Sequence, residues 1–286
     1  MNDHNIDLIA LQETKANNCS QEVRTTETCK FTFFFSSTVR RETNARGRLL
    51  EHHGVGFIVG PKFGDYILDC VPHNSRTIEI KFGNHGSNMR FVNQYAPHSR
   101  RPREEKHVHW EYIPELMHSQ PRQIPIFILG DTNARLHGCT SLEEEQIMCP
   151  HIFGLGHHHV PSLPDEQAGN RQCLVDFCIA NKYFISNTRF EKTSSKRCTF
   201  KETTTEGSIA PWTPDRFAQL DFILSPEEYK NAVLNVDART DIAFNSDHAV
   251  VVATIRLKLK TKKHLSKTPL NDTAPQPNPG TTPSLQ

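Results

Sequence analysis

The chain has 286 residues, of which 36% are hydrophobic and 17 are phenylalanine, enough for one large domain with a sizeable core. Its net charge of +1 excludes a global attraction to nucleic acid, so any such binding has to come from a local patch. The eight cysteines are scattered without a C-x-x-C pair, and the pattern predicts neither a signal peptide nor a transmembrane segment. We therefore expect an intracellular protein, in the nucleus or the cytoplasm, with reduced thiols.

Short apolar runs in the first third of the chain predict a series of β-strands. These runs cover residues 6–11, 31–35, 54–59, 77–82 and 90–95. Residues 77–82 alternate polar and apolar side chains, which is typical of a strand with one face exposed to water. The last run ends just before Pro97, which disfavours further regular structure.

The middle of the chain contains the predicted helices. Arg103–His118 is rich in Glu, His and aromatic side chains and is predicted to be an amphipathic helix. Residues 124–129 form another buried strand, which ends at Gly130 and Asp131. We expect a loop over residues 133–170 and a second helix over residues 172–181.

The predicted strands of the last third cover residues 183–186, 222–224 and 249–257. Many short strands with few helices between them favour an α+β sandwich over a doubly wound parallel sheet. We expect one domain over residues 1–257. Residues 258–286 begin with a lysine cluster and continue with a Pro- and Thr-rich segment that is too polar to bury a core, which predicts a disordered tail.

Polar side chains lie next to several of these apolar runs, where strands are expected to end. They are Glu13, Tyr95, Asp131, Asn133, Asp221, Asp247 and His248. Carboxylates bind hard divalent cations, and an Asp with a His can handle a nucleophilic water. Together these groups are typical of metal-assisted cleavage of a phosphate ester.

Asp131 and Asn133 stand two positions apart and emerge on one face if the chain stays extended there. Asp131 could then accept a proton from water while Asn133 orients that water or a phosphate oxygen. The alternative is a turn in which the Asp side chain caps the following backbone, a structure that Gly-Asp-x-Asn forms readily.

Structural alternatives exist for the other residues as well. Glu13 could bind Mg²⁺ or could be a surface acid in a helix N-terminal turn. Asp221 lies within an apolar stretch, so its carboxylate needs a partner, either His248 or an arginine. Tyr95 could aim its hydroxyl at a phosphate or could pack in a turn.

Five segments of the chain together resemble one family. They are residues 8–15, 95–98, 128–134, 219–224 and 246–248. In this order they resemble the endonuclease/exonuclease/phosphatase superfamily, and in particular the apurinic/apyrimidinic-type endonuclease domain of LINE-type non-LTR retrotransposons. The resemblance implies a DNase-I-like four-layer α/β/β/α sandwich.

The resemblance also implies a role for each residue. Glu13 and Asp247 resemble the carboxylates on the Mg²⁺ side, where Mn²⁺ could substitute. Asp131 is similar to the Asp that activates water, with Asn133 beside it. Asp221 resembles the Asp that orients the catalytic His, here His248, and Tyr95 the Tyr that faces the phosphate.

The implied substrate is DNA, with no membrane and no obligate protein partner. Asn170, Arg100 and Trp212 are the candidate substrate-binding residues. The family's usual first strand, which ends in an Asn, has no counterpart before residues 6–11, so we expect a member that lacks this strand. An alternative function stays open: a non-catalytic interaction protein on a remnant nuclease scaffold.

Overall fold

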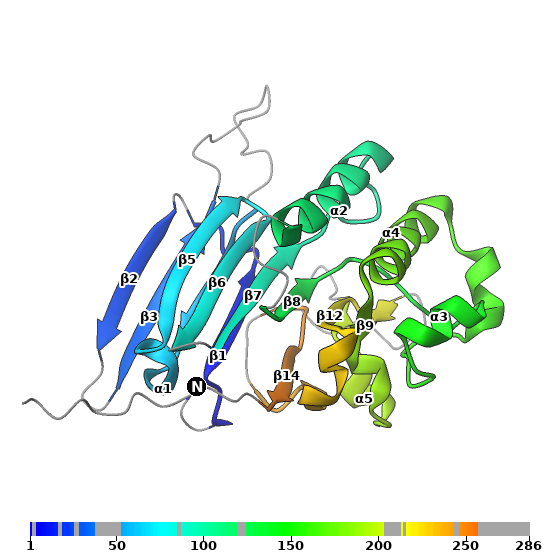
Figure 1. The fold of residues 1–286 in the computed structure, drawn as a ribbon. Coiled ribbons are helices and arrows are strands. Elements are labelled where there is room, and N and C mark those ends of the chain that lie inside the picture. Colours follow the sequence, from blue (N-terminus) through cyan, green and yellow to red (C-terminus); the bar gives the residue numbers. More distant parts are fainter. Residues whose placement is uncertain are drawn as a thin grey trace, which may run out of the picture.

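The computed structural model describes residues 1, 4–16, 19–25, 29–37, 53–84, 87–118, 124–202, 213, 216–242 and 246–256 (Figure 1). Its strands are β1 (Leu8–Gln12), β2 (Ser20–Thr25), β3 (Lys30–Ser36), β4 (Val55–Val59), β5 (Ile67–Asn74), β6 (Thr77–Asn84), β7 (Ser87–Tyr95), β8 (Ile126–Asp131), β9 (Tyr183–Ile185), β10 (Phe200–Lys201), β11 (Phe217–Ala218), β12 (Asp221–Pro226), β13 (Val233–Arg239) and β14 (Val250–Ile255). Its helices are α1 (Pro61–Gly64), α2 (Arg103–His118), α3 (Leu142–Ile147), α4 (Asp165–Asn181) and α5 (Ser194–Arg197), with the short 3-10 helices η2 (His157–Ser162), η3 (Ser186–Arg189) and η5 (Glu227–Ala232).

Two main sheets form the body of the protein. One has the strand order β1-β4-β3-β2, and the other has the order β5-β6-β7-β8-β12-β9. Every neighbouring pair in them is antiparallel except β7 and β8, which run parallel. Strands β13 and β14 form a separate two-stranded sheet, as do β10 and β11. This arrangement is the predicted α+β sandwich.

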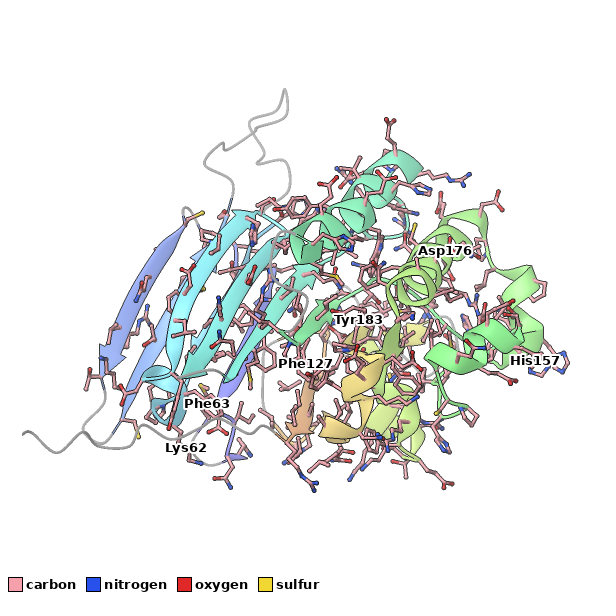
Figure 2. All side chains as sticks on the ribbon, viewed as in Figure 1. Lys62, Phe63, Phe127, His157, Asp176 and Tyr183 are labelled. Atoms are coloured by element: carbon pink, nitrogen blue, oxygen red, sulfur yellow. The ribbon has the colours of Figure 1, made fainter. Side chains whose placement is uncertain are left out.

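Two hydrophobic clusters hold the layers together. One lies between the main sheets and includes Phe57, Ile80 and Phe127, each at most 1% exposed. The other lies between the six-stranded sheet and the helices α2 and α4, which lie next to each other in Figure 1. Figure 2 shows Phe127 and Tyr183 inside the protein, where an apolar side chain is stabilised by its removal from water. On the four-stranded sheet, the helix that contacts β3 among the described residues is α1, which is a single turn.

The prediction of a half-exposed strand at residues 77–82 was wrong, because both faces of β6 are buried. Ile78, Ile80 and Phe82 face the cluster between the sheets. Glu79 points the other way but forms a two-point ion pair with Arg90 on β7, whose Nη2 lies 2.7 Å from Oε2 of Glu79. A buried carboxylate is tolerated where a cation and hydrogen bonds accompany it, so the alternation of polar and apolar residues did not indicate exposure.

Other elements differ from the prediction in extent. The second helix begins at Asp165, seven residues before the predicted start, because Pro164 precedes a first turn whose acids Asp165 and Glu166 favour a helix N-terminus. The predicted loop also contains α3 and η2. Strands β2, β5 and β13 were not predicted, since β2 is mostly polar, β5 contains a proline, and the apolar residues of β13 are interrupted by Asn235 and Asp237.

The described residues contain no helix that is both long and apolar enough to span a membrane. The predicted tail and Trp212 lie outside the described residues, so the domain boundary at residue 257 and the role of Trp212 stay predictions.

Candidate active site

Tyr95, Asp131 and Asp221 are direct neighbours across three strands of the six-stranded sheet. Tyr95 ends β7 and pairs with Asp131, which ends β8. Asp131 in turn pairs with Asp221, the first residue of the antiparallel strand β12. The three residues therefore lie side by side in one row, across the ends of β7 and β8 and the start of β12.

The backbone before and after Asp131 fixes its carboxylate. Gly130 has φ of 134°, and a Cβ at this position would lie 2.0 Å from the carbonyl oxygen of Gln94, so a side chain there would be strained. Asn133 donates its backbone N–H to Oδ1 of Asp131 at 2.8 Å and its side-chain amide to Oδ2 at 3.2 Å. The capped turn that was the alternative is therefore present, Asn133 has φ of 50° and is not extended, and the catalytic role of Asp131 and Asn133 stays a prediction.

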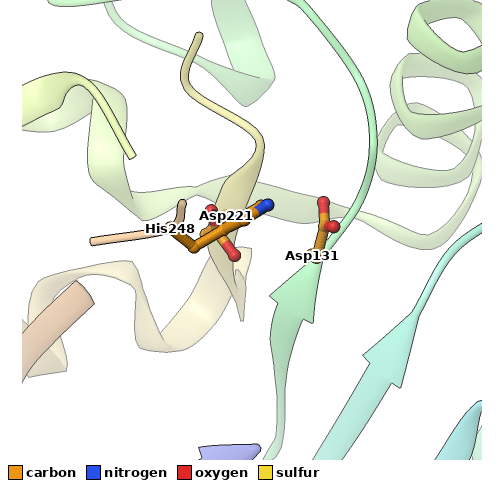
Figure 3. A group of neighbouring side chains, drawn as sticks. All are labelled: Asp131, Asp221 and His248. Carbon is orange, nitrogen blue, oxygen red and sulfur yellow. Dashed lines mark hydrogen bonds and ion pairs between the residues drawn. The ribbon is translucent and has the colours of Figure 1, made fainter. Parts of the chain in front are cut away.

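Strand β10, which sequence analysis did not predict, holds His248 next to this row. Phe200 in β10 forms a bridge with His248, while the backbone of Lys201 donates to the carbonyl of Asp247 at 2.9 Å. Nδ1 of His248 then lies 2.8 Å from Oδ2 of Asp221. Figure 3 shows the side chains of His248, Asp221 and Asp131 close to one another. One ligand atom of each residue lies within 4.8 Å of those of the other two.

Charge and burial shift the acidities of this group strongly. Burial and the neighbouring carboxylate of Asp221 raise the pKa of Asp131 to about 8, although His248 and the N–H of Asn133 favour its charged form. Burial alone would lower the pKa of His248, but Asp221, Asp131 and Asp247 raise it to about 10. His248 is therefore an imidazolium at neutral pH, paired with Asp221 and close to Asp131.

Glu13 lies just beyond β1 and meets the row at Tyr95. The Tyr95 hydroxyl donates to Oε1 of Glu13 at 2.6 Å. Burial and this hydrogen bond raise the pKa of Tyr95 far above its usual range, so the phenol stays protonated. Glu13 has φ of 50° and is exposed, which leaves its carboxylate accessible from the solvent side.

A cavity of about 1130 Å³ opens onto all of these groups and is lined by Glu13, Asp131, Asp221, Asp247 and His248, among others. Asp247 is exposed, like Glu13. Two donor sets could accept a cation here. The set of Asp131, Asp221 and His248 is compact but already joined by a hydrogen bond, whereas Glu13 and Asp247 offer accessible carboxylate oxygens, the ligands that Mg²⁺ prefers.

The candidate substrate-binding residues lie in different places. Arg100 is exposed and lines the same cavity. Asn170 is 2% exposed in α4, and its amide donates to the carbonyl oxygens of Pro97 at 3.0 Å and of Asn133 at 2.8 Å. Asn170 therefore fixes the two loops that follow Tyr95 and Asp131, a placement that fits a positioning residue rather than one that touches substrate.

Two supporting residues were missed in the sequence. Oγ1 of Thr199, which is 1% exposed, accepts the backbone N–H of Leu220 at 2.9 Å and of Asp221 at 3.2 Å. The amide of Asn187 donates to the carbonyl of Asp221 at 3.0 Å. Both hold the start of β12. Neither stands beside a site motif, so only the pairing of distant segments reveals them.

Among curated proteins, the chain is similar to craniofacial development protein 2. It is 29% identical to that of Tragulus javanicus over 214 residues, which is 74% of this chain and 33% of the relative. It is 28% identical to that of Bos taurus over 211 residues, which is 74% of this chain and 32% of the relative. The chain thus spans about a third of the length of these relatives. No family model matches it.

Among solved structures, the chain is similar to the AP endonuclease LMAP from Leishmania major, with a TM-score of 0.59 and 12% identity over 90% of this chain and 80% of that one. It is also similar to the catalytic domain of APE2 from Xenopus laevis, with a TM-score of 0.54 and 14% identity over 91% of this chain and 87% of that one. The chain therefore has the DNase-I-like α+β fold of these endonucleases, as its motifs predicted.

Proposed function

We propose that this chain is a Mg²⁺-dependent phosphodiesterase that nicks DNA, related to the target-site endonucleases of non-LTR retrotransposons. The observation that carries the proposal is the row of Tyr95, Asp131 and Asp221 with His248 against it. Five separate stretches of the sequence contribute to one cavity edge, and each contributes the type of side chain that phosphodiester hydrolysis uses.

In the proposed reaction, a water molecule attacks the phosphorus in line with the leaving oxygen. Asp131 in its carboxylate form, which its pKa of about 8 makes the minority form at neutral pH and the majority form above pH 8, accepts the proton of this water as the new P–O bond forms and the bond to the leaving oxygen breaks. Asn133 holds the Asp131 carboxylate in place through the two hydrogen bonds described above. Because its carboxylate is fixed before substrate arrives, Asp131 needs little reorganisation during the reaction.

His248 and Tyr95 act on the charge that develops on the phosphate. The Asp221 carboxylate fixes the ring of His248 through Nδ1 and favours the imidazolium. A cation beside a pentavalent phosphorus stabilises the negative charge of the transition state. The Tyr95 hydroxyl donates its one proton to Glu13 at 2.6 Å, and to act on the phosphate it would turn this proton to a phosphate oxygen.

Glu13 and Asp247 would hold the ion. Their fit to Mg²⁺ lies in the donor chemistry, because both are exposed carboxylates on one cavity and both are hard oxygen ligands. A bound Mg²⁺ would supply electrostatic stabilisation of the leaving oxygen. Arg100, an exposed residue that lines the cavity, is suited to contact a backbone phosphate of the DNA. We propose that Trp212 contacts a DNA base.

Plasmid nicking tests the proposal. Supercoiled plasmid is incubated with the full chain in Mg²⁺ or in EDTA, and open-circle product is followed over time. We expect nicking in Mg²⁺ alone, and Asp131→Ala should reduce its rate by roughly 100- to 10,000-fold, the contribution of a general base. Asp176→Asn, which removes one exposed carboxylate on α4, is the matched control and should cut at the wild-type rate.

Two outcomes would contradict the proposal. Equal rates for Asp131→Ala and wild type would place the activity elsewhere. A folded wild-type protein that neither cuts DNA nor releases heat on titration with Mg²⁺ would favour the alternative, a non-catalytic interaction protein on this scaffold.

A further inference from the structure

A second, smaller cavity lies beside the candidate active site. It has a volume of about 150 Å³ and is lined by Arg135, His137, Arg197, Phe217 and Gln219, among others. Pockets that take a whole drug-sized ligand measure about 300–1,000 Å³, so this cavity fits a single chemical group rather than a complete molecule. Arg135 lines both this small cavity and the large one, so the two cavities are neighbours.

The chain connects the small cavity directly to the candidate site at two places. Arg135 stands two residues after Asn133, and Gln219 stands two residues before Asp221. Two residues of chain span at most about 7 Å, so two walls of the cavity begin within that distance of the candidate site. Successive phosphates of one DNA strand rise about 3.4 Å along the helix axis. A phosphate a few nucleotides from the cut therefore lies within reach of the small cavity.

Arg197 brings a positive charge without a counter-charge to the small cavity. Its Nη1 donates to the carbonyl oxygen of Ile152 at 3.0 Å, and its Nε has no acceptor among the described residues. The ion pairs formed by the described part of the chain do not include Arg197. A guanidinium has five N–H donors, so Arg197 retains donors for an anion.

Gln219 adds a neutral donor to the same cavity. Its side chain is 4% exposed, and its Oε1 accepts the backbone N–H of Phe153 at 3.1 Å. This hydrogen bond fixes the orientation of the amide. The Nε2 of the same amide has no acceptor among the described residues, so both of its N–H groups are available to an oxygen in the cavity.

The charge of the small cavity favours an anion. Two of the described residues that line it are arginines and none is acidic. Much of the remaining wall is apolar, from Ile152, Phe153 and Leu155, and an apolar surrounding strengthens the attraction between a guanidinium and an anion. The planar fork of a guanidinium matches the oxygens of a phosphate. A phosphate group therefore fits both the size and the donors of this cavity.

From these observations we infer that the small cavity binds a backbone phosphate of the DNA, a few nucleotides from the phosphate that is cut. Arg197 and Gln219 donate to its oxygens, and Arg135, which lines both cavities, adds positive charge between the two phosphates. The inference rests on the proposed function, because it concerns the same substrate. Phosphate contacts set the position of a protein on DNA, so this second contact places the strand relative to Asp131.

DNA binding without cleavage tests the inference. A short fluorescein-labelled duplex is titrated with the full chain in EDTA, and the dissociation constant is measured by fluorescence anisotropy at several salt concentrations. Arg197→Met removes the unpaired charge. Gln219→Glu keeps the shape and the acceptor for Phe153 but places a negative charge at the cavity. We expect each variant to bind DNA at least about tenfold more weakly, and Arg197→Met to lower the slope of log affinity against log salt by about one.

Arg189→Met is the matched control. Nη1 of Arg189 also donates to a backbone carbonyl, that of Lys230 at 2.8 Å, but Arg189 lines neither cavity. Its replacement should leave the affinity and the salt slope at their wild-type values. Thermal melts of all three variants check that they fold, and Gln219→Glu keeps the test valid if Arg197→Met loses stability with its contact to Ile152.

The outcomes separate this inference from the proposed function. Pocket variants that bind DNA like wild type, or that weaken it no more than Arg189→Met, would overturn the inference while plasmid nicking in Mg²⁺ still supports the nuclease. A wild type that binds DNA through the small cavity but does not nick would contradict the nuclease alone, and one that neither binds nor nicks would contradict both. Inorganic phosphate is the second probe: if it stabilises wild type but not Gln219→Glu while both bind DNA equally, the cavity takes free phosphate and the inference fails.

Discussion

The ion pair inside the six-stranded sheet offers a quantitative test of the structure, through the substitution Glu79→Gln. Arg90 is 1% exposed, and its guanidinium contacts the Glu79 carboxylate at two points and the carbonyl of Leu116 in α2 at 3.3 Å. The pair thus links β6 and α2 to β7, the strand that ends in Tyr95. Glutamine has nearly the same shape, so the substitution mainly leaves the Arg90 cation without its counter-charge.

Two routes give a similar magnitude. Removal of one partner of a buried ion pair costs about 3–5 kcal/mol. Burial alone would raise the pKa of Glu79, but His73 and Arg90 lower it from 4.5 to about 2, and at 1.36 kcal/mol per unit this difference corresponds to roughly 3 kcal/mol. For a domain of this size, a loss of about 3 kcal/mol lowers the melting temperature by roughly 6–12 °C.

The pH dependence follows from the sign of this shift. A carboxyl group whose pKa is lower in the folded state binds fewer protons there than in the unfolded state. Its contribution is therefore complete above about pH 4.5 and is lost as the pH falls toward 2. Melts of wild type and Glu79→Gln should differ most at neutral pH and converge in acid.

The assay is calorimetry from pH 3 to pH 7, with the double variant Glu79→Leu/Arg90→Met as the control. Replacement of both partners by apolar side chains removes the unpaired charge and should recover most of the lost stability. A Glu79→Gln melt within about 2 °C of wild type at pH 7, or a double variant less stable than the single one, would refute the buried pairing.

Further predictions concern the candidate site. Tyr95→Phe removes the hydroxyl bonded to Glu13 and should slow plasmid nicking by about tenfold or more while the melt stays close to that of wild type; an unchanged rate would exclude the phenol from the reaction. Asn170→Ala removes two buried hydrogen bonds and should lower stability by about 2–3 kcal/mol and slow nicking, whereas Asn181→Ala, at the end of the same helix, should leave the nicking rate intact. Thr199→Val keeps the shape but leaves two buried N–H groups without their acceptor, so urea unfolding should show a loss of about 2–4 kcal/mol; a loss below 0.5 kcal/mol would contradict the described contacts.

Much of the fold could be predicted because the apolar runs of β1, β4, β7, β8 and β14 are long enough to indicate strands. The polar residues at the ends of these strands could therefore be predicted together as one candidate site. Sequence analysis did not predict which strands pair with one another. The row that joins Tyr95 to Asp221 depends on the parallel register of β7 with β8 and the antiparallel register of β8 with β12.

Residues whose side chains form hydrogen bonds with the backbone of a distant strand could not be predicted either, because strand pairing was not known from the sequence. Thr199 and Asn187 look like ordinary polar residues until β12 is placed beside them. Glu79 alternates with apolar neighbours and therefore looked exposed, because its partner Arg90 lies on another strand. Asn170 was predicted from a loose motif match, and only its burial in α4 shows that its amide holds two loops.

The most direct measurement of the central claim is the fate of the attacking oxygen. Cleavage of duplex DNA by the full chain in Mg²⁺ and H₂¹⁸O, followed by mass spectrometry of the products, reports which bond forms. A water molecule activated by Asp131 should place one ¹⁸O in the phosphate at each cut. Cleavage products whose phosphate carries no ¹⁸O would contradict hydrolysis at phosphorus, and with it the role assigned to this row of residues.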